Sequence, residues 1–295
     1  MSQRVIKALS ALEIGKGDIL YIASDITSFA IEVVNAKQDI NECFNELING
    51  LQNLVGDSGT LMFPIYSWDF NKGKSFDIRY TVGGTGALSN WILKNRPDFI
   101  RTAHPIYSFM VWGKDANTLA SMNNIDCFGQ FSPFGYMYKC DAKMIFFNVP
   151  IRRGVTFTHY VEESLQVPYR YFKPFSAKYI DSNGIESNRT YVMYVRDMNI
   201  KSKEYMPDSF YKDIVKEIKF DSFYIKLLGS RDTFRLTADD LLNNGGKNIY
   251  KLSVSNIGPR GRKWDSKEVT NNITVYNRPK TPSSLIRKDF SSMSV

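Results

Sequence analysis

The chain contains 295 residues and carries a net charge of +8 at pH 7, with 43% apolar and 14% aromatic residues. This composition is typical of a folded globular protein rather than a disordered one. Nowhere do about 18 apolar residues run together, so we expect no membrane span. We expect no signal peptide either, because Ser10, Glu13 and Lys16 interrupt the apolar stretch near the N-terminus. Three widely spaced cysteines without a C-x-x-C motif indicate reduced thiols in a cytoplasm and disfavour a disulfide framework or a metal site: Cys43, Cys127 and Cys140.

Apolar periodicity predicts that helices and strands alternate through the first part of the chain. Helices are expected at 5–12 and 40–56, before Pro97, at 115–123, and as a short helix or turn at 132–141. Strands are expected at 18–24, 60–66, 107–113 and 143–149. Strands that alternate with helices are typical of a mostly parallel sheet with helices on both faces.

The pattern changes beyond Pro174. Extended segments around the turn at 182–184 predict a β-hairpin within 177–197. A polar helix is expected at 208–220 and a further strand at 223–229.

We therefore predict an α/β fold in which a central sheet, mostly parallel or mixed, is covered by helices on both faces. Residues 1–295 are expected to form one domain, because no internal repeat or low-complexity tract divides the chain. Within it, residues 1–174 form the regular part and residues 175–295 an elaborated C-terminal part.

One of the two histidines of the chain lies in the stretch TFTHYVEESLQVPYR. If this stretch is helical, His159 shares a face with Glu162 and Glu163. A carboxylate that accepts a hydrogen bond from one ring nitrogen leaves the other nitrogen as an acceptor, which is how a general base is oriented. One of the two threonines that flank Phe157 is expected to cap the helix. The alternative is a surface pair that stabilises the helix by roughly a few tenths of a kcal/mol.

The second histidine lies in RTAHPIYS, just before a predicted strand. This segment combines a guanidinium, an imidazole and hydroxyls, from Arg101, Thr102, His104 and Ser108. Loops at strand ends are where α/β folds place their functional sites. Ordinary turn chemistry and a salt bridge are the alternative for each of these residues.

Five segments in order resemble the aminoglycoside 3-N-acetyltransferases and their relatives, which acylate amino sugars from coenzyme A thioesters. The segments are GDILYIASDITSF, VGDSGTLMFPIYSWDF, GALSNWILKNRPDFIRTAHPIYSFMVWG, SPFGYMYKCDAKMIFFNV and TFTHYVEESLQVPYR. The resemblance runs from about Gly15 to Lys173 with similar spacings. It implies that residues 1–174 form the acyl-CoA and catalytic part and that residues 175–295 form the diverged, acceptor-side part. The chain departs from the family pattern in carrying Ala23 for a histidine, Asp25 for a serine and Thr102 for a serine.

The resemblance implies an acyl-CoA-dependent N-acyltransferase, with acetyl-CoA as the expected donor. No metal is expected, because of the spacing of the cysteines. The resemblance also implies that His159 is the general base and that Glu162 orients it. The expected acyl-CoA site comprises Ser24, Thr27, Ser28, Arg101, Thr102, His104 and Ser108. The expected acceptor contacts are Asp69, Glu163, Tyr169 and Arg170. Direct transfer is expected, because the sequence contains no G-x-S-x-G motif and no cysteine beside a matching histidine.

The acceptor is a small-molecule amino sugar under this reading. The segment 251–295 contains nine basic and three acidic residues and so carries a net charge of +6. A basic rim suits an anionic acceptor, so we expect a nucleotide-linked amino sugar of surface-glycan biosynthesis. The alternatives are an aminoglycoside-modifying resistance enzyme and, in another class, a binding module that has lost its chemistry. No nucleic-acid recognition motif is present, and a homodimer stays open.

Overall fold

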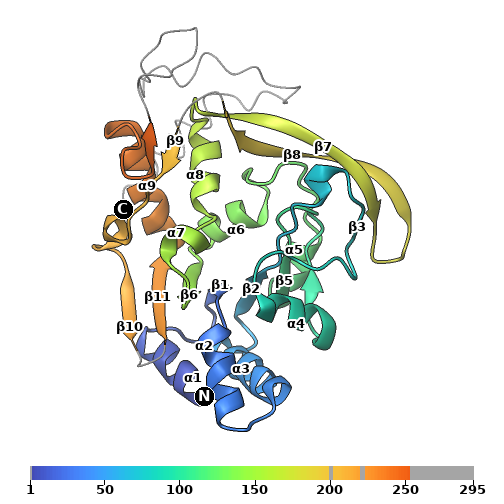
Figure 1. Cartoon of the computed structure of the whole chain (residues 1–295), viewed down its shortest axis with the longest axis vertical. Helices are drawn as coiled ribbons and strands as arrows, with labels where there is room; N and C mark the ends of the chain where they lie inside the picture. Colours follow the sequence, from blue (N-terminus) through green and yellow to red (C-terminus); the bar gives the residue numbers. More distant parts are fainter. Residues whose placement is uncertain (1, 199–201, 220–222, 253–295) are drawn as a thin grey trace.

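The computed structural model describes residues 2–198, 202–219 and 223–252. Its centre is a mixed seven-stranded sheet in the order β10-β11-β6-β1-β2-β5-β4 (Figure 1). The strands are β1 Ile19–Ser24, β2 Thr60–Pro64, β4 Ile100–Arg101, β5 Phe109–Gly113, β6 Lys143–Phe147, β10 Lys216–Lys219 and β11 Tyr224–Gly229. β6, β1 and β2 run parallel, whereas the pairings on both sides of them are antiparallel. The predicted α/β fold is confirmed, with a sheet that is mixed rather than mostly parallel.

The central strands are buried on both faces, because successive side chains of a strand point to opposite sides. In β1, Leu20 and Ile22 belong to one apolar core and Tyr21 and Ala23 to the other. The helices of the first core are α1 Ser2–Ala11, α2 Thr27–Asn35, α3 Ile40–Val55 and α4 Ala87–Asn95. Those of the second core are α5 Ala116–Ala120, α6 Pro133–Lys139, α7 Ile151–Gly154, α8 Thr158–Leu165 and α9 Ser230–Asn243. Helices therefore cover both faces, as predicted.

The predicted hairpin is confirmed as a long curved arm at the edge of the molecule (Figure 1). It consists of β7 Arg170–Ile180 and β8 Glu186–Arg196, and the short strand β3 Phe76–Asp77 pairs with β7 in parallel. A separate antiparallel pair joins β9 Ser202–Glu204 to β12 Tyr250–Leu252. Because β7 starts shortly after α8 ends, the arm is continuous with the helix that carries His159.

The polar helix expected at 208–220 is wrong. The segment forms a short 3-10 turn, η2 Asp208–Tyr211, and then β10, which pairs antiparallel with β11. Apolar residues at Ile214, Val215 and Ile218 have helical spacing, but so short a run does not separate helix from strand. Pairing with β11 provides hydrogen-bond partners for the backbone of β10, and this favours a strand over a helix.

Helix α9 was not predicted. Its buried residues Phe234, Ala238 and Leu241 do repeat at helical spacing. Polar residues between them give the segment a low overall hydrophobicity, which hid the pattern. The helix packs against α8 and α6 and so borders the helix of the histidine motif.

Of the basic segment 251–295, only Lys251 and Leu252 lie within the described residues. The charge pattern that favoured an anionic acceptor therefore falls almost wholly outside them. In the described ranges no helix has the length and apolar character needed to cross a bilayer. The same ranges hold no group of three or more His, Cys, Asp or Glu side chains arranged for a metal ion.

Candidate active site

His159 lies in the first turn of α8, between a buried carboxylate and the protein surface. Its Nδ1 is 2.6 Å from Oε2 of Glu162, as their spacing in a helix predicts. The His159 side chain is 26% exposed, whereas that of Glu162 is completely buried. The imidazole packs edge-on against Phe128, with 5.3 Å between ring centroids. The ring is therefore oriented from inside the protein and reaches solvent at its outer edge.

The threonine cap expected at the start of this helix is wrong. Phe157 occupies the N-cap with helical dihedral angles, φ −55° and ψ −25°, and no side chain caps the helix. The first amides bond to carbonyls of the preceding turn instead, Thr158 to Val155 and His159 to Thr156. The chain enters the helix through a tight turn, so the extended conformation of a side-chain cap is not available.

Three side chains surround the carboxylate of Glu162. Besides His159, the hydroxyl of Tyr169 donates to Oε1 at 2.9 Å, and Nε of Arg170 lies 2.9 Å from Oε2. Burial acts to raise the pKa of Glu162, but the charge of Arg170 and the two hydrogen bonds overcome it and leave the pKa lowered. Glu162 is therefore a carboxylate at neutral pH.

The guanidinium of Arg170 is fixed by its two terminal nitrogens. Nη1 donates to the carbonyl of Tyr194 at 3.1 Å, and Nη2 donates to the hydroxyl of Tyr250 at 2.7 Å. Among the described residues no acceptor is aligned with the Nε–H of Arg170, so the contact with Glu162 is an ion pair rather than a hydrogen bond. Burial acts to lower the pKa of Arg170, and the charge of Glu162 more than restores it.

These contacts assign the tautomer of His159. Nη2 of Arg170 lies 3.1 Å from Nδ1 of His159, and Glu162 lies on the same nitrogen at 2.6 Å. A guanidinium can only donate and a carboxylate can only accept, so the shorter contact places a proton on Nδ1. Nε2 is then the acceptor of the ring and the atom available for proton abstraction.

Cys127 lies in the interior near this group and is 1% exposed. Burial and the charge of Glu163 raise its pKa well above the ordinary value. A protonated, buried thiol is a poor nucleophile, which favours direct transfer over an acyl-enzyme. Glu163 is itself 1% exposed, so its expected contact with the acceptor stays a prediction.

The side chain of Arg101, at the end of β4, is also buried, but its hydrogen-bond partners are neutral. It donates to the carbonyls of Thr81 at 2.5 Å and Ile65 at 3.3 Å and to Oγ of Ser108 at 3.1 Å. Its guanidinium lies over the ring of Phe76 at 4.7 Å. Burial lowers the pKa of Arg101 to about 10. These contacts tie together three segments of the chain.

Thr102 and His104 complete this internal network. Oγ1 of Thr102 accepts from the amide of Phe109 at 2.9 Å. Nδ1 of His104 accepts from the amides of Ile106 at 3.3 Å and Tyr107 at 3.2 Å. Burial lowers the pKa of His104 to about 3, so the ring is neutral. All four side chains of RTAHPIYS expected at the acyl-CoA site lie in the interior, and their contact with the donor stays a prediction.

The turn after β1 presents a carboxylate where hydroxyls were expected to meet the donor. Oδ1 of Asp25 accepts from the amide of Thr27 at 3.0 Å and from its hydroxyl at 2.6 Å. Oγ of Ser28 accepts from Nδ2 of Asn148 at 3.3 Å, and Ser24 is half-buried at the end of β1. The like charge of Asp25 would oppose a diphosphate at this helix start, so that role also stays a prediction.

The four expected acceptor contacts separate into two places. Tyr169 and Arg170 are buried against Glu162, behind His159 rather than beside an open surface. Asp69 instead forms ion pairs with Lys72 and Lys74, each at 3.1 Å, and its side chain is 45% exposed. The structure thus joins Tyr169 and Arg170 to the histidine pair and leaves Asp69 outside this set of contacts.

Tyr250 is the residue of this site that the sequence analysis missed. It lies on β12, 80 positions from its partner Arg170. No motif marks it, because it falls beyond the segments that resemble a family. The pairing of β12 with β9 brings it to the network.

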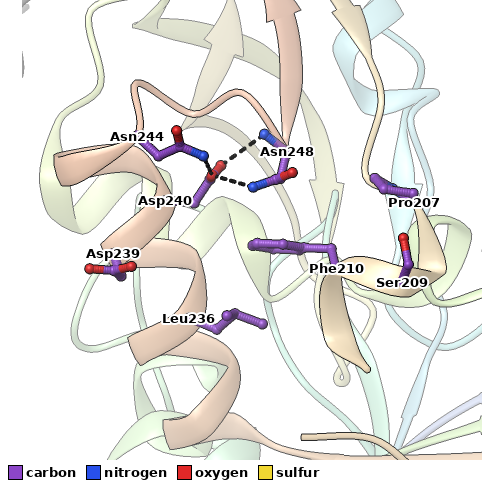
Figure 2. A pocket seen from close by; sticks show the side chains of 8 residues that line it. All are labelled: Pro207, Ser209, Phe210, Leu236, Asp239, Asp240, Asn244 and Asn248. Atoms are coloured by element: carbon purple, nitrogen blue, oxygen red, sulfur yellow. Dashed lines mark hydrogen bonds between the residues drawn. The ribbon is translucent and has the colours of Figure 1, made fainter. Parts of the chain in front are cut away.

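A groove of about 390 Å³ lies next to the segment that leads to Tyr250 (Figure 2). It lies between η2 and α9 and is lined by Pro207, Ser209, Phe210, Leu236, Asp239, Asp240, Asn244 and Asn248. Asp240 is 3% exposed and accepts from the side-chain amides of Asn244 and Asn248, each at 2.7 Å. The carboxylate is satisfied by protein donors and fixes the end of α9.

The sequence pattern of the aminoglycoside 3-N-acetyltransferase family matches residues 30–241 of the chain. The chain is similar to the SPbeta prophage-derived aminoglycoside N(3')-acetyltransferase-like protein YokD of Bacillus subtilis (strain 168). The two align over a length of 285 with 21% identity, and the match covers 84% of this chain and 95% of YokD.

Solved structures share the fold. The aminoglycoside acetyltransferase AAC(3)-Xa superposes with a TM-score of 0.66 at 18% identity, over 84% of this chain and 93% of that one. AAC-IIIb, solved as a binary complex with CoASH, superposes with a TM-score of 0.65 at 14% identity, over 83% of this chain and 97% of that one. The likeness extends well beyond the segments recognised in the sequence.

Proposed function

The chain belongs to the aminoglycoside 3-N-acetyltransferase family, and we propose that it transfers an acetyl group from acetyl-CoA directly to an amine of an aminoglycoside, with His159 as general base. As a member of this family it is an N-acetyltransferase that uses acetyl-CoA and acts on amino sugars. The observation that carries the proposal is the 2.6 Å contact between Nδ1 of His159 and the buried carboxylate of Glu162.

The reaction requires little besides a positioned base. As the amine nitrogen attacks the thioester carbonyl, Nε2 of His159 accepts a proton from it. A C–N bond forms, the C–S bond breaks, and the proton can pass to the departing thiolate. A positioned general base contributes about 10²- to 10⁴-fold to the rate. No protein nucleophile is needed, in agreement with the protonated state of Cys127.

Glu162 is proposed to serve the proton transfer in two ways. Its hydrogen bond holds Nδ1–H, so that Nε2 carries the lone pair before the reaction. Its negative charge then stabilises the imidazolium that forms. Arg170 would neutralise the carboxylate before catalysis, which makes burial of Glu162 tolerable. Burial of these groups strengthens their interactions, because the local dielectric is lower than in water.

The acceptor is proposed to be an aminoglycoside rather than a nucleotide-linked sugar. The matched family and the related structures are aminoglycoside acetyltransferases, and no finding supports a role in surface-glycan biosynthesis. The charge argument for an anionic acceptor is also weak, because residues 1–250 carry a net charge of only +2. The basic surplus belongs to the segment 251–295.

A thiol-release assay tests the proposal. The protein would be incubated with acetyl-CoA and, separately, a kanamycin-type aminoglycoside and nucleotide-linked 3-amino and 4-amino sugars. We expect release of free CoA with the aminoglycoside at kcat/KM near or above about 10⁴ M⁻¹s⁻¹, the lower edge of ordinary enzyme efficiency. Turnover confined to the nucleotide-linked sugars would overturn the acceptor assignment. Absence of turnover with every amine would overturn the activity.

A further inference from the structure

We infer that Tyr250 is a positioning residue for His159: its hydroxyl holds the guanidinium of Arg170 so that the proton of the imidazole stays on Nδ1 and Nε2 remains the base. The inference rests on the proposed function of His159 and extends it to a residue outside the family motif. It assigns a catalytic purpose to β12, a strand of the C-terminal part.

The guanidinium depends on Tyr250 for its orientation. Nε of Arg170 is close to Glu162, but its N–H is not aligned for a hydrogen bond. The plane of the guanidinium is therefore set by Nη1 on the carbonyl of Tyr194 and Nη2 on the hydroxyl of Tyr250. The nitrogen bonded to the hydroxyl of Tyr250 is Nη2, and the same nitrogen also approaches His159.

Nη2 of Arg170 carries two N–H groups and lies near two acceptors, the hydroxyl of Tyr250 at 2.7 Å and Nδ1 of His159 at 3.1 Å. The bond to Tyr250 holds Nη2 at the longer distance from Nδ1, and Nδ1 donates to Glu162 at 2.6 Å. Without the hydroxyl, Nη2 can move closer to Nδ1 and its N–H then competes for the lone pair of Nδ1, which must be unprotonated to accept it. The imidazole proton would move to Nε2, and the ring would present a donor where the reaction needs an acceptor.

Tyr250 is itself rigidly placed. It is 5% exposed, and its ring packs against Tyr169 with 5.1 Å between centroids. The chain before it is anchored by Asp240, which accepts from the backbone amide of Asn248 at 3.1 Å and from its side chain at 2.7 Å (Figure 2). The amide of Tyr250 also donates to the carbonyl of Gly246 at 2.8 Å. A hydroxyl held in this way can fix a flexible side chain.

The two histidines make the tautomer directly measurable. Nitrogen NMR of protein labelled with ¹⁵N-histidine distinguishes a protonated ring nitrogen from an unprotonated one. His159 is expected to show a protonated Nδ1. His104 is expected to show the opposite tautomer, because its Nδ1 accepts from two backbone amides. His104 therefore serves as an internal reference in every spectrum.

Tyr250→Phe removes the hydroxyl and keeps the ring packed on Tyr169. We expect protonation of His159 to move from Nδ1 toward Nε2 and kcat to fall about tenfold, the effect of one hydrogen bond to a charged group, with an unchanged KM for acetyl-CoA. Tyr179→Phe is the control, because it loses a buried hydroxyl bonded to the carbonyl of Ala103 at 2.9 Å. It should leave both histidine tautomers as they are.

An unchanged His159 tautomer in Tyr250→Phe would overturn the inference, whatever the rate. A changed tautomer with an unchanged kcat would support the positioning role and instead refute His159 as the base. The spectrum requires no turnover, so failure of the inference and failure of the proposed function are read separately.

Discussion

The two histidine motifs of this chain contain similar residue types, but the two imidazole rings differ in exposure and in hydrogen-bond partners. His159 contacts a carboxylate and its side chain is 26% exposed. His104 is 2% exposed and its Nδ1 accepts from two amides. Each motif also contains a buried arginine: Arg170 pairs with Glu162, whereas Arg101 bonds to carbonyls and a hydroxyl.

The first surroundings allow a histidine to exchange a proton, whereas the second keep it neutral. A positive charge on His159 would be stabilised by the neighbouring carboxylate of Glu162, and the imidazole ring reaches solvent. His104 can gain a charge only at the expense of its two amide hydrogen bonds and in a site closed to water. These surroundings favour His159 as the proposed base, because a neighbouring carboxylate can stabilise its charged form. Presence in a polar motif alone would not distinguish it from His104.

Replacement of His159 should give the largest effect. His159→Ala is expected to lower kcat by about 10²- to 10⁴-fold, because the amine loses its proton acceptor. The KM for acetyl-CoA and the circular dichroism spectrum should stay near those of the parent protein. Ser164→Ala on the same helix is the control and should retain full activity. Near-normal kcat in His159→Ala would remove this histidine from the mechanism.

Arg101→Ala should act on stability instead of the reaction. The change leaves buried carbonyls without a donor, and we expect the free energy of unfolding to fall by about 3 kcal/mol. Urea denaturation measures this loss. Arg235→Ala is the matched control, because Arg235 pairs with Asp232 and its side chain is 78% exposed; its effect should be close to zero.

The same variant tests the predicted donor site. Calorimetric titration with coenzyme A should give a Kd within about twofold of the parent value if Arg101 is structural. A Kd raised about tenfold, the effect of a lost hydrogen bond to a charged group, at unchanged stability would mean that the loop binds the acyl donor.

Glu162→Gln should lower kcat by about ten- to a hundredfold, less than loss of the base itself, because the amide cannot stabilise the imidazolium by charge. The carboxyl also affects stability. Its pKa in the folded protein lies below the ordinary value of 4.5, so its contribution is present above that pH and is lost as the pH falls through the folded-state pKa.

Urea denaturation of Glu162→Gln and the parent protein should therefore differ at pH 7, and the difference should shrink below about pH 4. Glu186→Gln is the control, because Glu186 pairs with Lys178 and its side chain is 57% exposed. It should change neither kcat nor this pH dependence. A difference in stability that is the same at both pH values would contradict the lowered pKa.

The sequence predicted the regular part of this molecule better than its connections. Helical spacing predicted the contact of His159 with Glu162, because both residues lie within one turn of the same helix. It could not predict that Tyr250 reaches Arg170, since that contact depends on how β12 pairs with β9. The sequence also could not show that the loop of Arg101 is buried rather than open to solvent, because the polarity of its residues does not reveal their burial.

His104 should give the smallest effect, and one that depends on pH. Its folded-state pKa is about 3 and its ordinary value is 6.5, so between these values the unfolded chain binds a proton that the folded protein does not. The free energy of unfolding then falls as the pH decreases, by at most about 1.4 kcal/mol per pH unit. His104→Gln should remove this slope between about pH 6 and pH 4.5, a range above the ordinary pKa of most carboxyl groups. Urea denaturation at several pH values measures the slope in both proteins. Equal slopes would mean that the folded protein protonates His104, and the contrast between the two histidines would fail.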